Sequence, residues 1–161
     1  MITSDSSPLI VFGRLGSLGL LRSCFQTVAI PGAVYSEVAC RPNSPEAIAL
    51  QEAIHTGWVV RQATPAAKLL LQANLGKGEV EALSLAKKLG TMLLIDDENA
   101  KTYAALLGIE AHGSIYVLFL ACKKGIIAKK QAKALLDSMV QTGFYISTNV
   151  YVRFVSLLET L

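Results

Sequence analysis

Residues 76–100, GKGEVEALSLAKKLGTMLLIDDENA, constrain the fold more than any other stretch of the chain. Two glycines precede an amphipathic helical pattern, which ends at Gly90. The apolar run at 91–95 that follows is typical of a short strand covered on both faces. The segment therefore predicts a glycine turn, a helix and a buried strand whose carboxyl end carries Asp96 and Asp97.

Strand-like and helix-like patterns alternate along the rest of the chain. The predicted strands lie at 1–4, 27–30, 58–60, 91–95 and 109–111, and the predicted helices at 8–21 (bent near two glycines), 31–40, 46–55, 65–72, 79–89, 98–107, 114–124, 129–141 and 147–159. This alternation indicates an α/β fold with a central parallel sheet of about four or five strands flanked by helices. No repeat or linker interrupts it, so a single domain over residues 1–161 is expected.

The composition favours a globular protein with a large apolar surface to bury. Hydrophobic residues make up 52% of the chain and charged residues 17%, which excludes a disordered chain and leads us to expect a dimer. The longest apolar stretch, 115–122, is much shorter than the roughly 20 residues of a bilayer span. Asp5 and the lack of a preceding basic residue do not fit a secretory signal, so we expect a cytoplasmic protein without membrane contact.

Cysteine and histidine do not suggest a catalytic or metal site. Cys24, Cys40 and Cys122 are widely spaced and form no CxxC motif, so we expect them to be small buried hydrophobes. His55 and His112 are far apart in the sequence. A histidine metal site or a Ser-His-Asp triad is therefore disfavoured.

Carboxylates follow two of the predicted strands. Asp5 comes directly after the first strand, and Asp96 and Asp97 come after the strand at 91–95. Open α/β sheets place their ligands at the carboxyl ends of strands. Adjacent carboxylates repel each other unless a positive charge lies beside them, which indicates a divalent cation. The alternative is that these acids only cap the helices that follow.

Two glutamates lie on predicted helices in positions that suit the same site. Glu79 follows the helical spacing of the apolar stripe of its helix, whereas Glu81 lies about 200° further round, on the side more open to water. Glu37 lies between Val34 and Val38, on a face expected to point inward. A carboxylate there is costly unless it is paired or bound to a metal. Alternatively, the helix is rotated so that Glu37 reaches solvent.

Together these acids suit a hard divalent cation. Carboxylate oxygens are the ligands that Mg²⁺ and Mn²⁺ prefer, and such ions activate water and stabilise charge on a phosphodiester under attack. Ser6 or Ser7 could hold a bound water or a phosphate oxygen. The sequence GKGE lacks the GK[ST] ending of a P-loop. A phosphatase or phosphoryl-acceptor domain would use the aspartates but leave the helix glutamates without a role.

The basic residues are too few to establish nucleic-acid binding by charge alone. The formal net charge is +3, but Lys123, Lys124, Lys129, Lys130 and Lys133 cluster around one glycine. One interpretation is a phosphate-attracting rim. The other is that these lysines are ordinary residues on solvated helix faces.

Seven short motifs occur in order along nearly the whole chain: SDSSPLI, IPGAVYSEV, LGKGEVEALSLAKKLG, LLIDDENA, GIEAHGSIYVL, KKGII and TGFYIS. Together they resemble the DUF3368 group of PIN-domain-like proteins. Members of the PIN superfamily are mostly metal-dependent ribonucleases. Many are toxins of prokaryotic type II toxin-antitoxin pairs, usually dimeric and inhibited by a small antitoxin. The resemblance implies an RNA substrate, an antitoxin partner and Mg²⁺ or Mn²⁺ as cofactor.

The resemblance also implies a set of catalytic, metal-binding acids. Asp5 matches the first-strand acid, Glu37 the helix acid after the proline, Glu79 the central-helix acid and Asp97 the acid after the fourth strand. PIN proteins usually carry a hydroxyl residue two positions before that last Asp, where this chain has Ile95. Asp96 is therefore an alternative ligand. The alternative function is a catalytically inactive PIN-like module that acts by binding a protein partner.

Overall fold

The computed structural model describes residues 1–161 and has a parallel five-stranded sheet at its centre. The strands are β1 (Ile2–Ser4), β2 (Val28–Ile30), β3 (Val59–Arg61), β4 (Leu93–Leu94) and β5 (Ala111–His112). Their order in the sheet is β3-β2-β1-β4-β5, and every neighbouring pair is parallel. This confirms the α/β fold expected from the alternating pattern.

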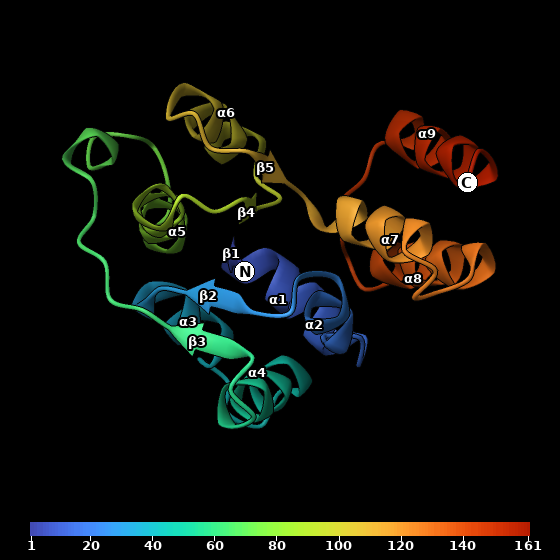
Figure 1. The fold of residues 1–161 in the computed structure, drawn as a ribbon, viewed down its shortest axis with the longest axis horizontal. Helices are drawn as coiled ribbons and strands as arrows, with labels where there is room; N and C mark the ends of the chain where they lie inside the picture. The colour runs from blue at the N-terminus through green and yellow to red at the C-terminus, as the bar shows by residue number, and fades with distance from the viewer.

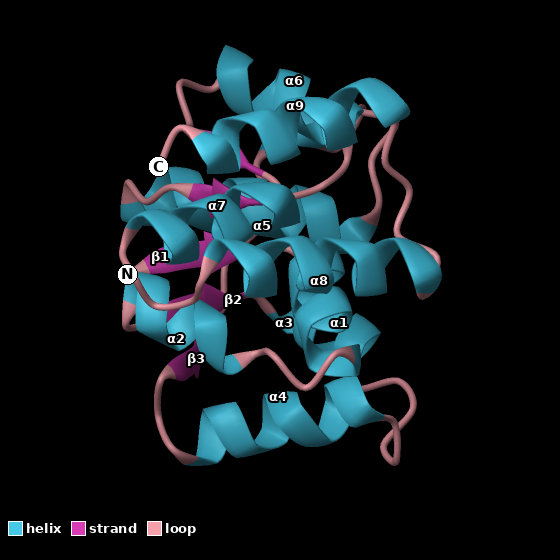
Figure 2. Ribbon diagram, turned by 90° about the vertical axis from the view of Figure 1, so that its right-hand side faces the viewer, coloured by secondary structure: helices cyan, strands magenta, loops and turns pink.

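Nine α-helices and one 3-10 turn surround this sheet. They are α1 (Ser6–Arg14), α2 (Gly19–Phe25), α3 (Gly32–Val38), α4 (Pro45–His55), η1 (Lys68–Leu70), α5 (Lys77–Leu89), α6 (Glu98–Leu106), α7 (Ser114–Lys123), α8 (Lys129–Gln141) and α9 (Thr148–Glu159). Figure 1 shows α5 on one side of the sheet and α1, α2, α7 and α8 on the other. Figure 2, turned by 90°, shows α4 at the end of the molecule next to β3.

The middle of the sheet sets the position of the candidate site. All three residues of β1 are buried, and Thr3 pairs with Ala29 of β2 on one side and Leu93 of β4 on the other. In the sheet, β2 and β3 follow on one side of β1, and β4 and β5 follow on the other side. The carboxyl ends of β1 and β4 therefore meet where the strand order reverses, the usual ligand position in such sheets.

One cluster of 33 buried apolar residues forms the core. The alternation of short apolar strands and amphipathic helices in the sequence supplies these residues. Gly90, in the left-handed conformation with a φ of 64°, ends α5 as expected. Ser147 caps α9 through its hydroxyl, which accepts from the Val150 N–H at 3.3 Å.

The helix predicted at 65–72 is wrong, because only the single turn η1 forms there. Leu70 is its one buried residue, while Leu69 and Leu71 are exposed. A longer helix would bury little further apolar surface, and short helices without tertiary packing are not stable. The chain instead crosses from β3 to α5 as an irregular segment.

The expectation that all three cysteines are buried is also wrong. Cys24 is buried, Cys122 is half-buried and Cys40 is exposed in the turn that follows α3. Cys40 lies beyond the last buried residue of α3, Val38, so the helix ends before it can be turned inward. No helix in the structure is both long enough and apolar enough to cross a membrane.

Candidate functional site

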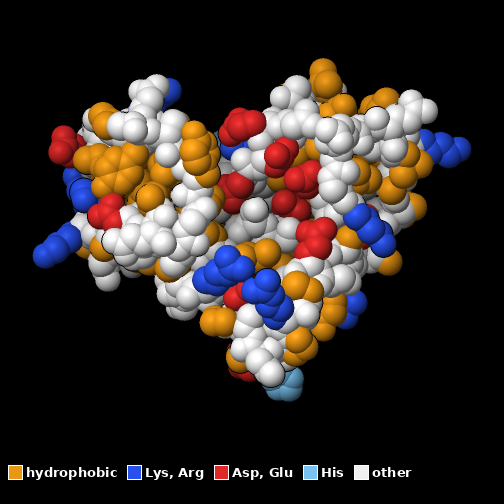
Figure 3. All heavy atoms as spheres, turned by 180° about the vertical axis from the view of Figure 1, so that it is seen from behind, with side chains coloured by type: hydrophobic (Ala, Val, Ile, Leu, Met, Phe, Trp, Pro, Cys, Tyr) orange, Lys and Arg blue, Asp and Glu red, His pale blue; other side chains and the backbone are white.

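Acidic residues from separate elements converge where β1 and β4 end. Asp5 follows β1 directly, and its backbone N–H donates to the carbonyl oxygen of Leu94 at 2.8 Å. Asp96 lies two residues after Leu94. Parallel pairing of β1 and β4 therefore brings together acids that are about ninety positions apart in the sequence. Figure 3 shows Asp and Glu side chains gathered in and around the notch between the two lobes of one face.

Asp5 is the most constrained of these acids. Asp5 is only 4% exposed, and its Oδ1 atom is buried without a hydrogen-bond partner. The pKa of Asp5 is raised to about 7, mainly by burial and also by the charges of Glu37, Glu79 and Asp96, while a hydrogen bond from the Ser6 backbone acts to lower it. A cation bound beside Asp5 would favour its ionised form.

Glu37 does not point inward as its flanking valines suggested. The residue is exposed, while Val34 and Val38 are buried. The α3 helix is rotated so that its valines meet the core and Glu37 lies at the edge of that face. This agrees with the solvent-facing alternative, but the carboxylate is still held by the protein.

Two other helices hold the Glu37 carboxylate. The Ser6 hydroxyl of α1 donates to Oε2 at 2.6 Å, and the Gly78 N–H of α5 donates to Oε1 at 3.0 Å. A Cβ atom on Gly78 would lie 2.5 Å from Oε1 and 2.6 Å from Oε2. Glycine at this position is therefore required for the close approach of α5 to Glu37. Ser6 was one of two serines that could hold a bound water or a phosphate oxygen, and here its hydroxyl donates to a carboxylate.

Glu79 and Glu81 differ in a way that the helical pattern predicted only in part. Glu79 Oε2 accepts from the Gly76 N–H at 2.7 Å at the start of α5, and its charge acts on Asp5. Glu81 was expected to face water. Instead its Oε2 accepts from the Ala33 N–H at 2.8 Å, at the start of α3. The reason is that α5 packs against α3, so this flank of α5 meets a helix end.

Replacing Glu81 is expected to affect stability and not the acid cluster. In Glu81→Ala the Ala33 N–H at the start of α3 loses its acceptor, which should lower the free energy of unfolding by about 1 kcal/mol. Urea unfolding of the variant against the parent measures this. A change of under a few tenths of a kcal/mol would contradict the capping role of Glu81. Glu52→Ala, an exposed acid on α4, is the matched control and should change little.

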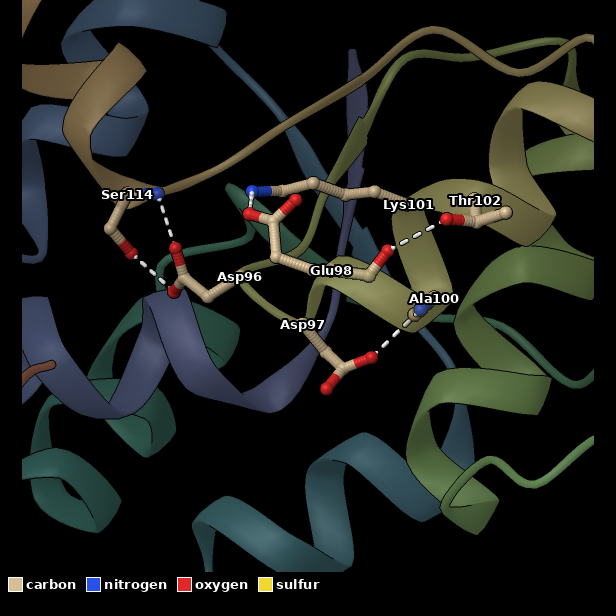
Figure 4. Close-up of polar contacts among 7 residues, drawn as sticks. All are labelled: Asp96, Asp97, Glu98, Ala100, Lys101, Thr102 and Ser114. Carbon is tan, nitrogen blue, oxygen red and sulfur yellow. Dashed lines mark hydrogen bonds and ion pairs between the residues drawn. The ribbon is translucent and has the colours of Figure 1, made fainter. Parts of the chain in front are cut away.

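The two neighbouring aspartates have different partners. Asp96 is half-buried; its Oδ1 accepts from the Ser114 N–H and its Oδ2 from the Ser114 hydroxyl, both at 2.7 Å. Asp97 is exposed, and its Oδ1 accepts from the Ala100 N–H at 2.7 Å, which caps α6. Figure 4 shows the two side chains pointing to different elements, α7 and α6. Capping, the alternative considered for these acids, thus describes Asp97.

Burial raises the pKa of Asp96, and the nearby charge of Glu98 adds to this. The backbone and side-chain hydrogen bonds from Ser114 and the charge of Lys101 act against that rise. Lys101 itself pairs with Glu98 at 2.7 Å. Of the two aspartates, Asp96 is therefore the one whose charge raises the pKa of Asp5. Its orientation is fixed by the N–H and the hydroxyl of Ser114.

Ser114 and Gly113 belong to the site, although the sequence analysis gave them no functional role. A Cβ atom on Gly113 would lie 2.8 Å from Asp96 Oδ1, so a side chain there would displace the carboxylate. The only signal available in the sequence was the pair Gly-Ser shortly after the predicted strand at 109–111, at a helix start. That pattern is common for capping and does not single out a partner eighteen residues away.

The oxygen atoms of these acids are suitable ligands for a hard cation, and the buried Asp5 Oδ1 is free to bind one. The buried Asp5 Oδ1 lacks a protein donor, and hydrogen bonds reach only one oxygen each of Glu79 and Asp97. Both oxygens of Glu37 and of Asp96 accept from the protein, though each oxygen keeps a second lone pair. No three Asp, Glu, His or Cys side chains are arranged closely enough to form a ready-made metal centre.

The cluster of lysines does not surround these acids. Lys123 ends α7, nine residues from Ser114 and therefore roughly 14 Å along the helix from the contact with Asp96. Lys124 donates to the Cys24 carbonyl oxygen at 2.7 Å, and Lys129 to that of Glu159 at 3.4 Å. This placement favours the interpretation of these lysines as residues on solvated helix faces over that of a phosphate-attracting rim around the acids.

Comparisons with known proteins agree with this architecture. The DUF3368 family model, described as a PIN domain, matches residues 1–160. A solved structure of a PilT N-terminus domain protein from the hyperthermophilic archaeon Sulfolobus solfataricus P2 matches with a TM-score of 0.51 and 22% sequence identity. The match covers 73% of this chain and 90% of the archaeal chain, and it shows a shared fold. A search of curated proteins gives no match.

Proposed function

Because the chain belongs to the DUF3368 family of PIN domains, which are generally nucleases, we propose that it is an endoribonuclease dependent on Mg²⁺ or Mn²⁺. It would hydrolyse RNA phosphodiester bonds in the cytoplasm. The observation that carries the proposal is Asp5, a buried carboxylate with a free oxygen, next to the charges of Glu37, Glu79 and Asp96. That concentration of negative charge is stabilised when a cation is bound.

Asp5, Glu79 and Asp96 would hold the cation, with Glu37 and Asp97 at its margin. When bound, a divalent cation supplies charge stabilisation at a phosphoryl oxygen and makes a nearby water more acidic. Ser114 fixes the direction of the Asp96 carboxylate, and Gly76 fixes that of Glu79. Such hydrogen bonds orient ligands before binding and are typical of metal sites.

The role as a toxin of a type II toxin-antitoxin pair is a further part of the proposal. It rests on the resemblance of the chain to that class of PIN protein. Large apolar side chains are exposed on α9, namely Val150, Val152 and Leu157. They offer a surface for the small antitoxin or for a second copy of the chain in the proposed homodimer. Light scattering of the purified protein, alone and with its antitoxin, measures both assemblies.

Cleavage of an RNA panel by the purified protein tests the proposed activity. Structured and single-stranded RNAs are incubated with Mg²⁺, with Mn²⁺ or with EDTA. We expect internal cuts with either ion and none with EDTA. Absence of cutting with both ions, together with no heat of Mg²⁺ or Mn²⁺ binding in calorimetry, would contradict the nuclease proposal.

A second candidate function is a non-catalytic module that binds a protein partner. One observation favours it: both carboxylate oxygens of Glu37 and of Asp96 already accept hydrogen bonds from the protein, so these acids have a structural role. In that case the acids join helices and hold no cation. The two functions are separated by the calorimetric measurement, because only the nuclease requires the ion to bind.

A further inference from the structure

A cleft opens beside the acid cluster and shares Asp96 with it. Its volume is about 480 Å³, within the range of roughly 300–1,000 Å³ that is typical of ligand sites. It is lined by Asp96, Glu98 and Lys101, by Gly113, Ile115 and Tyr116, and by residues 144–147 with Val150. Figure 1 shows α6 and α9 on either side of the start of α7, where these residues lie. The cleft thus continues the candidate site toward the C-terminal helix.

Tyr145 is presented to this cleft by an anchored segment. It is 90% exposed, whereas its neighbours Phe144 and Ile146 pack against the core. The Phe144 N–H donates to the Met139 carbonyl oxygen at 3.0 Å, and Ser147 caps α9. The segment is therefore held at both ends, with its aromatic ring directed outward. An aromatic side chain kept in water on a fixed loop is more typical of a binding residue than of a structural one.

A second aromatic ring, Tyr116, lines the same cleft. The ring of His112 stacks on it, with centroids 3.8 Å apart and planes inclined by 13°. His112 is in turn held by Glu110, at 2.9 Å from Nε2 to Oε1. Tyr116 is thus fixed in orientation before any ligand arrives. Lys101 and Glu98 add a cation and an acceptor at the border of the cleft.

We propose that this cleft is a nucleobase subsite, in which a base of single-stranded RNA stacks on Tyr145 while the strand continues to the acids around Asp5. The inference rests on the proposed function. Asp96 belongs both to the acid cluster and to the cleft, so one strand can occupy both. Unpaired bases stack on aromatic side chains without strict sequence preference, whereas bases inside a duplex are not available for stacking.

The test measures binding separately from cleavage. Fluorescence anisotropy in EDTA compares an oligouridylate of about ten nucleotides with an abasic ribose-phosphate strand of equal length. Both strands carry the same charge, so repulsion by the acids affects them equally. We expect Tyr145→Ala to bind the oligouridylate about five- to 150-fold more weakly and the abasic strand unchanged. Tyr145→Phe should stay within about twofold of the parent.

Leu106→Ala is the matched control, because Leu106 is 77% exposed on α6 and does not line the cleft. Equal binding of the two strands by the parent, or an unchanged affinity of Tyr145→Ala for oligouridylate, would overturn the subsite. If the protein cleaves RNA but either of these binding results is found, the nuclease proposal is supported and only the nucleobase subsite is rejected. A base-dependent loss in Tyr145→Ala without any cleavage would support the subsite and count against the nuclease.

Discussion

The Asp5→Asn variant is expected to lose metal-dependent RNA cleavage by about a thousandfold or more. A bound divalent ion supplies several kcal/mol of charge stabilisation, and every 1.36 kcal/mol corresponds to a factor of ten in rate. Asparagine keeps the size of the side chain but removes the charge that faces Glu37, Glu79 and Asp96. Single-turnover cleavage with Mg²⁺ and with Mn²⁺ measures the loss.

The same substitution is expected to stabilise the metal-free fold, and more so at higher pH. Burial raises the pKa of Asp5 to about 7 from its ordinary value of 3.8. The folded state therefore binds more protons than the unfolded state between these values, and stability falls as pH rises through that window. A shift of about three units corresponds to roughly 4 kcal/mol of destabilisation above pH 7, against about 1.5 kcal/mol at pH 5.

Denaturant unfolding in EDTA at pH 5 and pH 8 tests this pH dependence. We expect the advantage of Asp5→Asn over the parent to widen by about 2–3 kcal/mol between the two pH values, since asparagine does not titrate. Glu52→Gln, on the exposed surface of α4, should change neither activity nor stability. An active Asp5→Asn enzyme would remove Asp5 from the site, and an advantage independent of pH would contradict its raised pKa.

The Gly78→Ala variant is expected to lose activity without losing stability. The new Cβ would lie 2.5 Å from Glu37 Oε1, so the Glu37 carboxylate has to leave its contacts with Gly78 and Ser6. Displaced residues next to a metal site typically reduce activity ten- to a hundredfold. Gly78 lies in the first turn of α5, where alanine favours the helix by roughly 0.5–1 kcal/mol over glycine. The Glu37 side chain can swing toward solvent, but it then loses its hydrogen bonds with Gly78 and Ser6, so the two effects on stability are expected to offset each other.

Gly32→Ala provides the control for Gly78→Ala. Gly32 also begins a helix, α3, but a Cβ atom there would meet nothing within 4 Å. We expect it to keep full activity in the same cleavage assay. In a Glu37→Ala background, Gly78→Ala should cause no additional loss, because the group it displaces is gone. An additional loss there would show that Gly78 acts by a route other than Glu37.

The sequence by itself determined the architecture. Continuous apolar runs such as 91–95 and helical stripes such as the one in α5 are local patterns, so they can be recognised in the sequence without knowing which elements they pack against. Because parallel strands leave their carboxyl ends at one edge, the pattern also placed Asp5 near Asp96 and Asp97. The core helices and the sheet direction therefore followed from spacing alone.

Only the tertiary structure decided how each acid is held. The helical pattern predicted an inward Glu37 and a solvent-facing Glu81, and neither prediction held, because the contacts of both residues depend on how α3 packs against α5. The separation of Asp96 from Asp97 depends on Ser114, which reaches the site through the pairing of β4 with β5. Hydrogen bonds between elements far apart in sequence leave no local pattern, and so the roles of neighbouring, chemically identical acids were fixed only by packing.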